Sequence, residues 1–378
     1  RYKHEVASLE LKDLSGGLIF NESGVVYSDL TANLFNYPFT IKMQSIESPK
    51  PATKISAEGI ITLESLKKQL HLPILEVFNG LFHVQALLNV TNDPKDFDSL
   101  SINSSLEGLA VNLPEPIGKN HKSKMPLQLQ LDFNPEEAIR FKAEYGSYLS
   151  SDLLFAEKQG AYVFKSGQLR LGSTDALDQQ KPGLAIVGNL ESFDLEQWSA
   201  LADKYKVEDK PSDWLKYLRI INVTLGKFTF LKQQFDKMVV IAKIDANKNW
   251  NVDLRQENIT GNLVYNPDNK ALSGHLQHLH INPLKSGASV SSPEKQISPS
   301  QIPPLNLRID NLEYGKIHVG LVVLKSQSLK HRWHINYCSI ESPDYQFLID
   351  GDWVKKGKIN RTNIALKLQL KNLAKTLE

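Results

Sequence analysis

Apolar and polar residues alternate along much of the chain. In residues 126–133, PLQLQLDF, Leu127, Leu129, Leu131 and Phe133 are separated by Gln128, Gln130 and Asp132. The segment 365–373, ALKLQLKNL, repeats the pattern. Strict alternation places all the apolar side chains on one face of a β-strand and the polar ones on the other. Such a face has to be covered, either by another layer of protein or by a ligand.

Short segments of this kind predict strands over most of the sequence, from 6–11 to 364–371, with Asn, Asp, Gly and Ser between them. Three segments predict helices instead, at 62–70, 73–78 and 193–205, because their apolar residues recur at helical spacing. Parallel α/β folds need a helix between successive strands, and these are mostly missing. We therefore predict a mainly β fold with a few short helices.

An internal repeat links two parts of the chain. Residues 218–227 read LRIINVTLGK and residues 307–316 read LRIDNLEYGK. Each copy is followed by a strand that opens on a tryptophan, Trp250 or Trp333. We expect the shared glycine to mark a bend or bulge between consecutive strands, so that the repeats stack into an array.

Composition places the chain among folded proteins, since 41% of its 378 residues are hydrophobic and 23% are charged. A net charge of +2 without basic runs argues against nucleic acid as a partner. The single cysteine, Cys338, excludes an intrachain disulfide. No apolar run approaches the roughly 20 residues of a membrane span. The chain begins with Arg1, and we interpret it as a piece of a longer protein, with either a membrane anchor or an export signal possible outside it.

The division that we predict has four parts. Residues 1–120 form an N-terminal β segment with short helices, and residues 121–283 form a middle β segment with one helix near 193–205. Residues 284–304 are rich in Ser and Pro and predict a long loop or linker. Residues 305–378 form a C-terminal β repeat.

Candidate chemistry is sparse. His275, His278 and His280 occur as HLQHLH, but no cysteine or carboxylate cluster completes a metal site, and alternation suits the wet face of a strand. Ser65 and Lys68 fit an S-x-x-K tetrapeptide whose partner motifs are absent. No nucleophile elbow, P-loop or dinucleotide fingerprint occurs. We predict a protein that is not an enzyme and that needs neither a metal nor a cofactor.

Several segments resemble the AsmA-like proteins of the YhdP and TamB type. They are residues 11–43, LKDLSGGLIFNESGVVYSDLTANLFNYPFTIKM, residues 104–119, SSLEGLAVNLPEPIGK, and residues 307–320, LRIDNLEYGKIHVG. The second is similar to the L-P-x-P-x-G-K segment of that group. In this order the matches cover most of the chain. The segment 284–304 departs from the pattern, and the family's N-terminal membrane helix is not present in these residues.

The resemblance implies a bridge-like lipid-transfer protein, anchored in the inner membrane of a Gram-negative bacterium and projecting into the periplasm. It implies an elongated, curled antiparallel sheet, a β-taco, whose apolar groove passes phospholipid to the outer membrane without chemistry. The implied partners are phospholipid acyl chains, the inner membrane through an anchor outside this segment, and other envelope proteins, but no nucleic acid. From alternation we predict that these residues line the groove: Leu127, Leu129, Leu131, Phe133, Phe228, Phe230, Leu305, Leu307, Ile309, Ile317, Val319, Leu366, Leu368 and Leu370.

Two alternatives remain open. The same faces could pair into a closed β-sandwich with a dry core, which would suit a scaffold in envelope assembly. A secreted polysaccharide enzyme with a β-solenoid body would instead need a carboxylate cluster in a cleft, and alternation points to none. The sandwich predicts that inward residues fill the space completely, whereas the groove predicts apolar side chains that polypeptide leaves uncovered.

Overall fold

The computed structural model describes residues 11–47, 51–70, 73–91, 93, 96–134, 138–159, 161–172, 181–205, 217–230, 232–283, 299, 302–329, 332–356 and 359–371. The chain divides into two compact units, Arg1–Arg219 and Ile220–Glu378, which we call unit 1 and unit 2 and describe separately. The loop predicted at 284–304 lies outside the described residues, apart from 299 and 302–304. The first strand predicted, at 6–11, also lies outside them except for Leu11.

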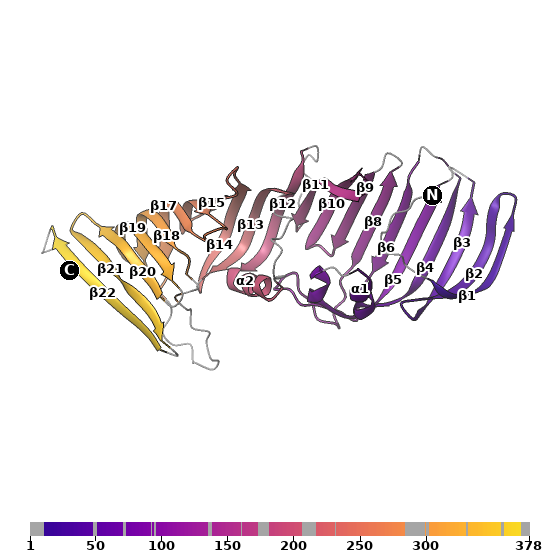
Figure 1. The fold of residues 1–378 in the computed structure, drawn as a ribbon, viewed down its shortest axis with the longest axis horizontal. Helices are drawn as coiled ribbons and strands as arrows, with labels where there is room; N and C mark the ends of the chain where they lie inside the picture. Colours follow the sequence, from indigo (N-terminus) through magenta and orange to yellow (C-terminus); the bar gives the residue numbers. More distant parts are fainter. Residues whose placement is uncertain are drawn as a thin grey trace. The chain divides into compact units, whose positions relative to one another are not determined.

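Unit 1 is a sheet in which most strands pair with the next strand in the chain (Figure 1). All pairs from β1 to β11 are antiparallel. The sequential order is broken once, where β6 pairs with β8 and the short β7 pairs with the start of β5. The strands are β1 (Lys12–Asn21), β2 (Gly24–Leu34), β3 (Tyr37–Ile46), β4 (Ala52–Thr62), β5 (Phe78–Thr91), β6 (Asp98–Ser104), β7 (Leu109–Val111), β8 (Leu127–Asn134), β9 (Ala138–Tyr145), β10 (Leu149–Lys158), β11 (Ala161–Leu171) and β12 (Gly183–Asp194).

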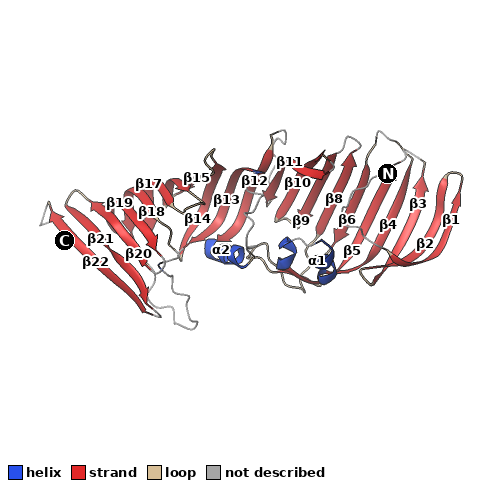
Figure 2. Cartoon of the chain, in the orientation of Figure 1, coloured by secondary structure: helices blue, strands red, loops and turns tan. Residues whose placement is uncertain are grey.

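The helices of unit 1 are α1 (Leu63–Leu70), the 3₁₀ helix η1 (Pro73–Val77) and α2 (Leu195–Lys204). All three coincide with helices that the apolar spacing predicts. Asp194 caps α2, because its carboxylate accepts a hydrogen bond of 2.9 Å from the Gln197 backbone N–H. The helices lie along one edge of the sheet of unit 1, where β4 and β12 end (Figure 2).

Unit 2 contains a second run of paired strands, and no α-helix occurs among its described residues. Its strands pair antiparallel with their successors, except for β17 and β18. They are β13 (Leu218–Phe230), β14 (Gln233–Ile244), β15 (Trp250–Gln256), β16 (Ile259–Tyr265), β17 (Leu272–Ile281), β18 (Leu305–Tyr314), β19 (Ile317–Leu329), β20 (Arg332–Glu341), β21 (Tyr345–Lys356) and β22 (Ile359–Leu370).

The mainly β prediction is confirmed, with one refinement in each unit. The pairs β11–β12 and β17–β18 are parallel, so the sheets are mixed rather than purely antiparallel. Parallel neighbours need a connection that returns the chain to the edge where the first strand began. Residues 172–182 and 282–304 supply the two connections. Alternation cannot reveal strand direction, because it is the same in both orientations.

The two copies of the LRI repeat are not structurally equivalent. Gly315 lies in the turn between β18 and β19 with φ of 59°, as a bend between strands requires. Gly226 instead lies inside β13, opposite Lys237, whose φ is 55°. The bend or bulge that the sequence predicts at this glycine is therefore absent from the first copy, because β13 runs through Gly226 and its register with β14 continues unshifted from Ile221 to Phe230.

Candidate functional site

The apolar side chains of unit 1 line up from strand to strand. Paired residues of neighbouring strands point to the same side of a sheet. Leu129 pairs with Ile102 of β6 and Ala143 of β9, and Leu131 pairs with Leu100 and Phe141. We call this side the apolar face of unit 1. Its two central rows are Leu30, Ile41, Ala57, Ala86, Ile102, Leu129, Ala143, Ser151, Leu169 and Ile186, and Met43, Ile55, Leu88, Leu100, Leu131, Phe141, Leu153, Gly167 and Leu184.

The opposite side of unit 1 is largely polar. Gln130 pairs with Ser101 and Lys142, and Lys142 pairs with Asp152. Arg140 on the same side holds Asp152 through two hydrogen bonds of 2.8 and 2.7 Å. Such a bidentate pair fixes both side chains against the strands. The two sides of this one sheet therefore differ in polarity, because one presents mainly apolar side chains and the other mainly polar ones.

The predicted β8 residues lie on the apolar face. Leu127, Leu129 and Leu131 are half-buried, and Phe133 is 36% exposed at the far end of the strand. Gln128 and Gln130 are exposed on the other side.

Protein covers one end of this apolar face. Leu63 of α1 and Leu109 of β7 pack with Phe82, Phe39 and Tyr145 in a single buried cluster. The Tyr145 hydroxyl donates a hydrogen bond of 2.9 Å to the Ile117 carbonyl, and burial raises the pKa of Tyr145 to about 12. We call this arrangement the cover of unit 1, comprising α1, η1, β7 and the segment 105–125.

A lysine holds the cover together from inside. The Lys119 ammonium donates hydrogen bonds to the carbonyls of Leu106 at 2.8 Å, Asn120 at 3.0 Å, and Leu109. Partial burial lowers the pKa of Lys119. This is the lysine of the L-P-x-P-x-G-K segment, and in this chain its contacts are structural.

Unit 2 carries an apolar face of the same kind. Its two central rows follow the register of ten strands without a polar residue. The rows are Val223, Val240, Leu254, Gly261, Leu276, Ile309, Val322, Ile340, Phe347 and Leu368, and Ile221, Ala242, Val252, Leu263, Gly274, Leu307, Leu324, Cys338, Ile349 and Leu366. Burial raises the pKa of the Cys338 thiol.

Most predicted residues of unit 2 belong to this face or adjoin it. Leu307, Ile309, Leu366 and Leu368 lie in the central rows, Leu305 pairs with Leu272, and Leu370 pairs with Tyr345. Phe228 contacts buried Phe235 with 6.2 Å between ring centroids, and Val319 packs against the buried cluster that contains Ile309 and Val322.

Two predicted residues lie at strand ends instead. Phe230 pairs with Gln233 at the end of β13 and is 41% exposed. Ile317 opens β19 and is 62% exposed. Neither belongs to the central rows.

In unit 1 the sequence prediction named lining residues from β8 alone, and it missed the residues of the apolar face that come from β2–β6 and β9–β12. In β4, small residues interrupt the pattern, because Gly59 leaves room for the Phe39 ring, which a Cβ atom would meet at 2.7 Å. In β10, Leu153 and Leu154 are consecutive, so alternation is hidden. Cross-strand register reveals both strands, and no property of the isolated segments does.

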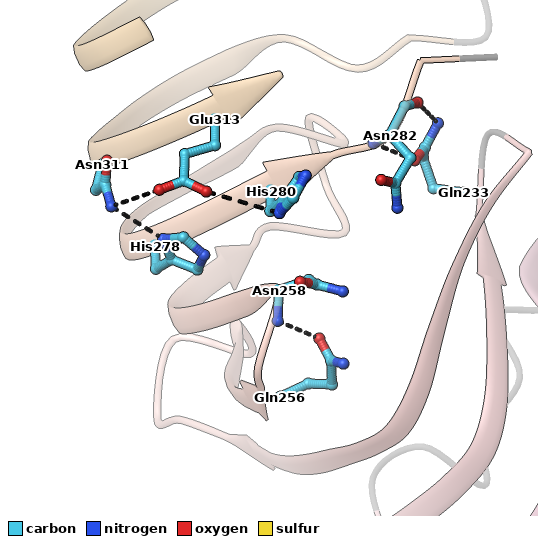
Figure 3. A network of polar contacts seen from close by, with 8 residues as sticks. All are labelled: Gln233, Gln256, Asn258, His278, His280, Asn282, Asn311 and Glu313. Atoms are coloured by element: carbon cyan, nitrogen blue, oxygen red, sulfur yellow. Dashed lines mark hydrogen bonds and ion pairs between the residues drawn. The ribbon is translucent and has the colours of Figure 1, made fainter. Parts of the chain in front are cut away.

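The three histidines of the HLQHLH segment lie on the polar side of unit 2. His275 contacts Asp310 at 2.6 Å, and this hydrogen bond lowers the pKa of Asp310. His278 meets Asn311 at 3.2 Å, and His280 approaches Glu313 at 3.6 Å (Figure 3). Within the described ranges no group of three or more His, Cys, Asp or Glu side chains could hold a metal ion. Each histidine has instead a polar partner on the neighbouring strand.

A glutamine bridges two strands that are not neighbours. The Gln233 amide at the start of β14 donates to the Asn282 carbonyl and accepts from the Asn282 N–H, each at 3.0 Å (Figure 3). Between β14 and β17 lie β15 and β16, of only seven residues each. Three strand spacings of about 4.8 Å would separate the ends in a flat sheet. The bridge therefore shows that this part of unit 2 is curled.

Comparison with known proteins gives one match, which spans almost the whole chain. The model of a family described as YhdP protein matches residues 3–378. No curated protein and no solved structure matches the chain. In the described part of the chain, no helix is both long enough and apolar enough to cross a membrane.

Proposed function

Because the chain belongs to the YhdP protein family, we propose that its apolar faces hold the acyl chains of phospholipids and let them pass from one strand to the next. The proposed route runs between the inner and outer membranes of a Gram-negative bacterium, with the chain in the periplasm. An inner-membrane anchor would lie outside these residues. The process is binding and passage without a chemical reaction, and it uses no cofactor.

The registered rows of apolar side chains carry this proposal. In unit 2, two rows cross ten strands without a charged or polar side chain. An ordinary half-covered sheet needs such a face only where a second layer packs on it. In the middle of these rows Leu276, Ile309 and Val322 are buried, but at the last strand Leu366 and Leu368 are 57% and 46% exposed, as expected where another apolar molecule covers the face.

Uniform lining suits movement better than tight binding. Each methylene group that leaves water stabilises the bound chain by about 0.8 kcal/mol. Neighbouring Leu, Ile, Val and Phe side chains offer nearly the same contact at each strand, so no position is strongly preferred. The polar headgroup has no partner in the central rows, and it would stay in water at an edge of the sheet.

The scaffold alternative needs a second β layer over the same leucines. Among the described residues, the strands of unit 2 form one layer, and helical or looped protein covers only one end of the apolar face of unit 1. The enzyme alternative needs a carboxylate pair in a cleft. The acidic side chains Asp310, Glu313 and Asp352 lie instead on the polar side, each beside a histidine.

A photocrosslinking scan tests the proposal. A photoreactive amino acid would be placed at each position from 128 to 131 and from 306 to 309, and the purified chain would be irradiated with phosphatidylethanolamine vesicles. We expect lipid adducts at residues 129, 131, 307 and 309, and few at the positions between them. Adducts at every position equally, or none at all, would contradict the proposal.

A matched pair of variants adds a second test. Leu129→Asp places a charge on the apolar face, whereas Gln130→Asp places it on the polar side one residue away. We expect binding of a fluorescent phospholipid to fall several-fold only in Leu129→Asp, because a carboxylate repels acyl chains. Circular dichroism would establish that both variants keep their strands.

A further inference from the structure

A row of aromatic side chains marks one edge of the apolar face of unit 2. Trp250 at the start of β15 pairs with Tyr265 at the end of β16. Trp333 near the start of β20 pairs with Trp353 near the end of β21. We call these four residues the tryptophan edge. It contains three of the five tryptophans of the chain.

The register places this row on the apolar side. Trp250 lies two and four positions from Val252 and Leu254, and Trp353 lies two and four positions from Gly351 and Ile349. Even spacing keeps these side chains on one face. All four aromatic residues are half-buried. From Tyr265 the register continues through Leu272 and Leu305 and reaches Ile335 and Gly351, so Trp333 and Trp353 lie two residues nearer the strand ends at the same edge.

The opposite edge of the same face is built differently. There, Phe228 and Phe235 pair at β13 and β14, and Ile259 of β16 pairs with Leu279 of β17. These four side chains have no polar atom. Tyr314 and Tyr345 also lie at this edge, where the Tyr345 hydroxyl donates to the Val319 carbonyl at 3.2 Å, but no tryptophan occurs in its described part. Trp and Tyr combine a large apolar ring with a polar N–H or O–H, so they favour boundaries between apolar and wet surroundings.

Basic residues occur just outside the tryptophan edge. Lys248 and Lys270 are exposed in the turns that precede β15 and β17, and Arg361 is exposed near the start of β22. Lys355 follows Trp353 by two residues, and Arg332 precedes Trp333. The carboxylate of Asp245 in the first turn accepts hydrogen bonds from Asn247, Asn249 and Asn251, so its acceptor capacity is largely used.

We infer that the tryptophan edge is where the phosphate-bearing headgroups of bound lipids lie, with the acyl chains extending parallel to the strands toward the opposite edge. This inference rests on the proposed function and adds the orientation of the lipid. Amphipathic rings at the boundary and cations beyond it match, in order, the ester region and the phosphate of a phospholipid.

The dimensions agree with this orientation. From Leu272 to Ile281, β17 has ten residues, which at about 3.3 Å each span about 30 Å. The acyl chains of one leaflet occupy half of a hydrocarbon core about 30 Å thick, or about 15 Å. A lipid whose headgroup lies at the tryptophan edge therefore keeps its tails on the apolar face, short of the opposite edge.

Two photoreactive lipids test the orientation with the full 378-residue chain. One is phosphatidylethanolamine with a diazirine on its headgroup, and the other has the diazirine at the end of an acyl chain. We expect the headgroup probe to label peptides that contain Trp250, Trp333 or Trp353. We expect the acyl probe to label peptides that contain Leu276 or Ile309, four residues along their strands from the tryptophan edge. Headgroup adducts at the opposite edge, or equally at both edges, would overturn the inference.

The same experiment separates this inference from the proposed function. If acyl adducts form on the apolar face while headgroup adducts miss the tryptophan edge, passage of lipid survives and the orientation fails. If neither probe labels the chain, both fail.

Charge reversal adds a readout that does not depend on adducts. We expect the double variant Lys248→Glu, Lys270→Glu to bind phosphatidylglycerol vesicles at least about five-fold more weakly, since each basic residue near an anionic surface contributes about that factor. The matched control is Lys316→Glu, Lys371→Glu, whose lysines are exposed at the opposite edge. Equal losses in the two double variants would count against the assignment.

Discussion

Unit 1 and unit 2 show the same alternation of apolar and polar residues, but their apolar faces differ in how far inserted segments cover them. In unit 1, segments inserted between β4 and β5 and between β6 and β8 fold back over one end of the apolar face. In unit 2, short turns join the described strands except β17 and β18, and Leu366 on the last strand remains 57% exposed. Alternation therefore determines that a sheet has an apolar side. The insertions between strands determine how much of that side is sealed by protein.

The largest effect should separate a covered leucine from an open one. Leu63 is 3% exposed inside the cover, whereas Leu366 lies on the open face of unit 2. We expect Leu63→Ala to lower the free energy of unfolding of unit 1 by about 2–4 kcal/mol, because it leaves a cavity. Leu366→Ala should change that of unit 2 by less than about 0.5 kcal/mol. Hydrogen exchange, resolved by unit with mass spectrometry, measures both. Similar losses would mean that unit 2 is sealed as well.

A smaller effect should come from the lysine inside the cover. Lys119→Met keeps the length of the side chain but removes donors from the carbonyls of Leu106, Leu109 and Asn120. We expect a loss of about 1–3 kcal/mol, as for other buried acceptors left without a partner. Faster exchange should be confined to the cover, so amides of β10 and β11 would serve as an internal reference. Lys122→Met, at an exposed position, provides the control and should have no measurable effect.

The smallest effect concerns acid and the polar side of unit 2. Because the hydrogen bond with His275 lowers the pKa of Asp310 in the folded chain, the unfolded chain takes up the proton first as the pH falls. The stabilisation is therefore present at neutral pH and is lost below about pH 4. Asp310→Asn should reduce the urea midpoint of unit 2 at pH 7 but not near pH 2. Asp268→Asn, in an exposed turn, should leave the profile unchanged, and a similar change in both variants would refute the role of this pair.

Local patterns in the sequence were sufficient for the helices and for the strands with strict alternation. Leu127–Phe133 and Leu366–Leu370 are strands as predicted, and α1 and α2 begin and end within a few residues of the expected positions. Elements whose residues obey a tertiary constraint were missed. Gly59 in β4 is small because the Phe39 ring lies against it, and the buried Asp152 in β10 is satisfied by Arg140 on the neighbouring strand.

The extent of the candidate site could be predicted less well than its chemistry. Phe82 and Leu88 lie on the same side of β5 and look alike in the sequence. Only Phe82 belongs to the cluster beneath the cover, because α1 and β7 return to that end of the strand. The two glycines of the LRI repeat teach the same lesson. The two copies share six of their ten residues, yet Gly315 lies in a turn and Gly226 lies inside a continuous strand that pairs with β14.

The bridge from Gln233 to Asn282 has a consequence for how the border of such a sheet can be shaped. A primary amide has two N–H donors and one carbonyl oxygen, so one N–H and the oxygen together can pair with the backbone N–H and C=O of one residue. Gln233 thus completes the ladder that a longer β15–β16 hairpin would have provided, although that hairpin ends early. Strands can in this way be shorter at one place in the sheet without leaving backbone groups without a hydrogen-bond partner. Single side chains of this kind allow the length of the strands to vary along the border of the sheet.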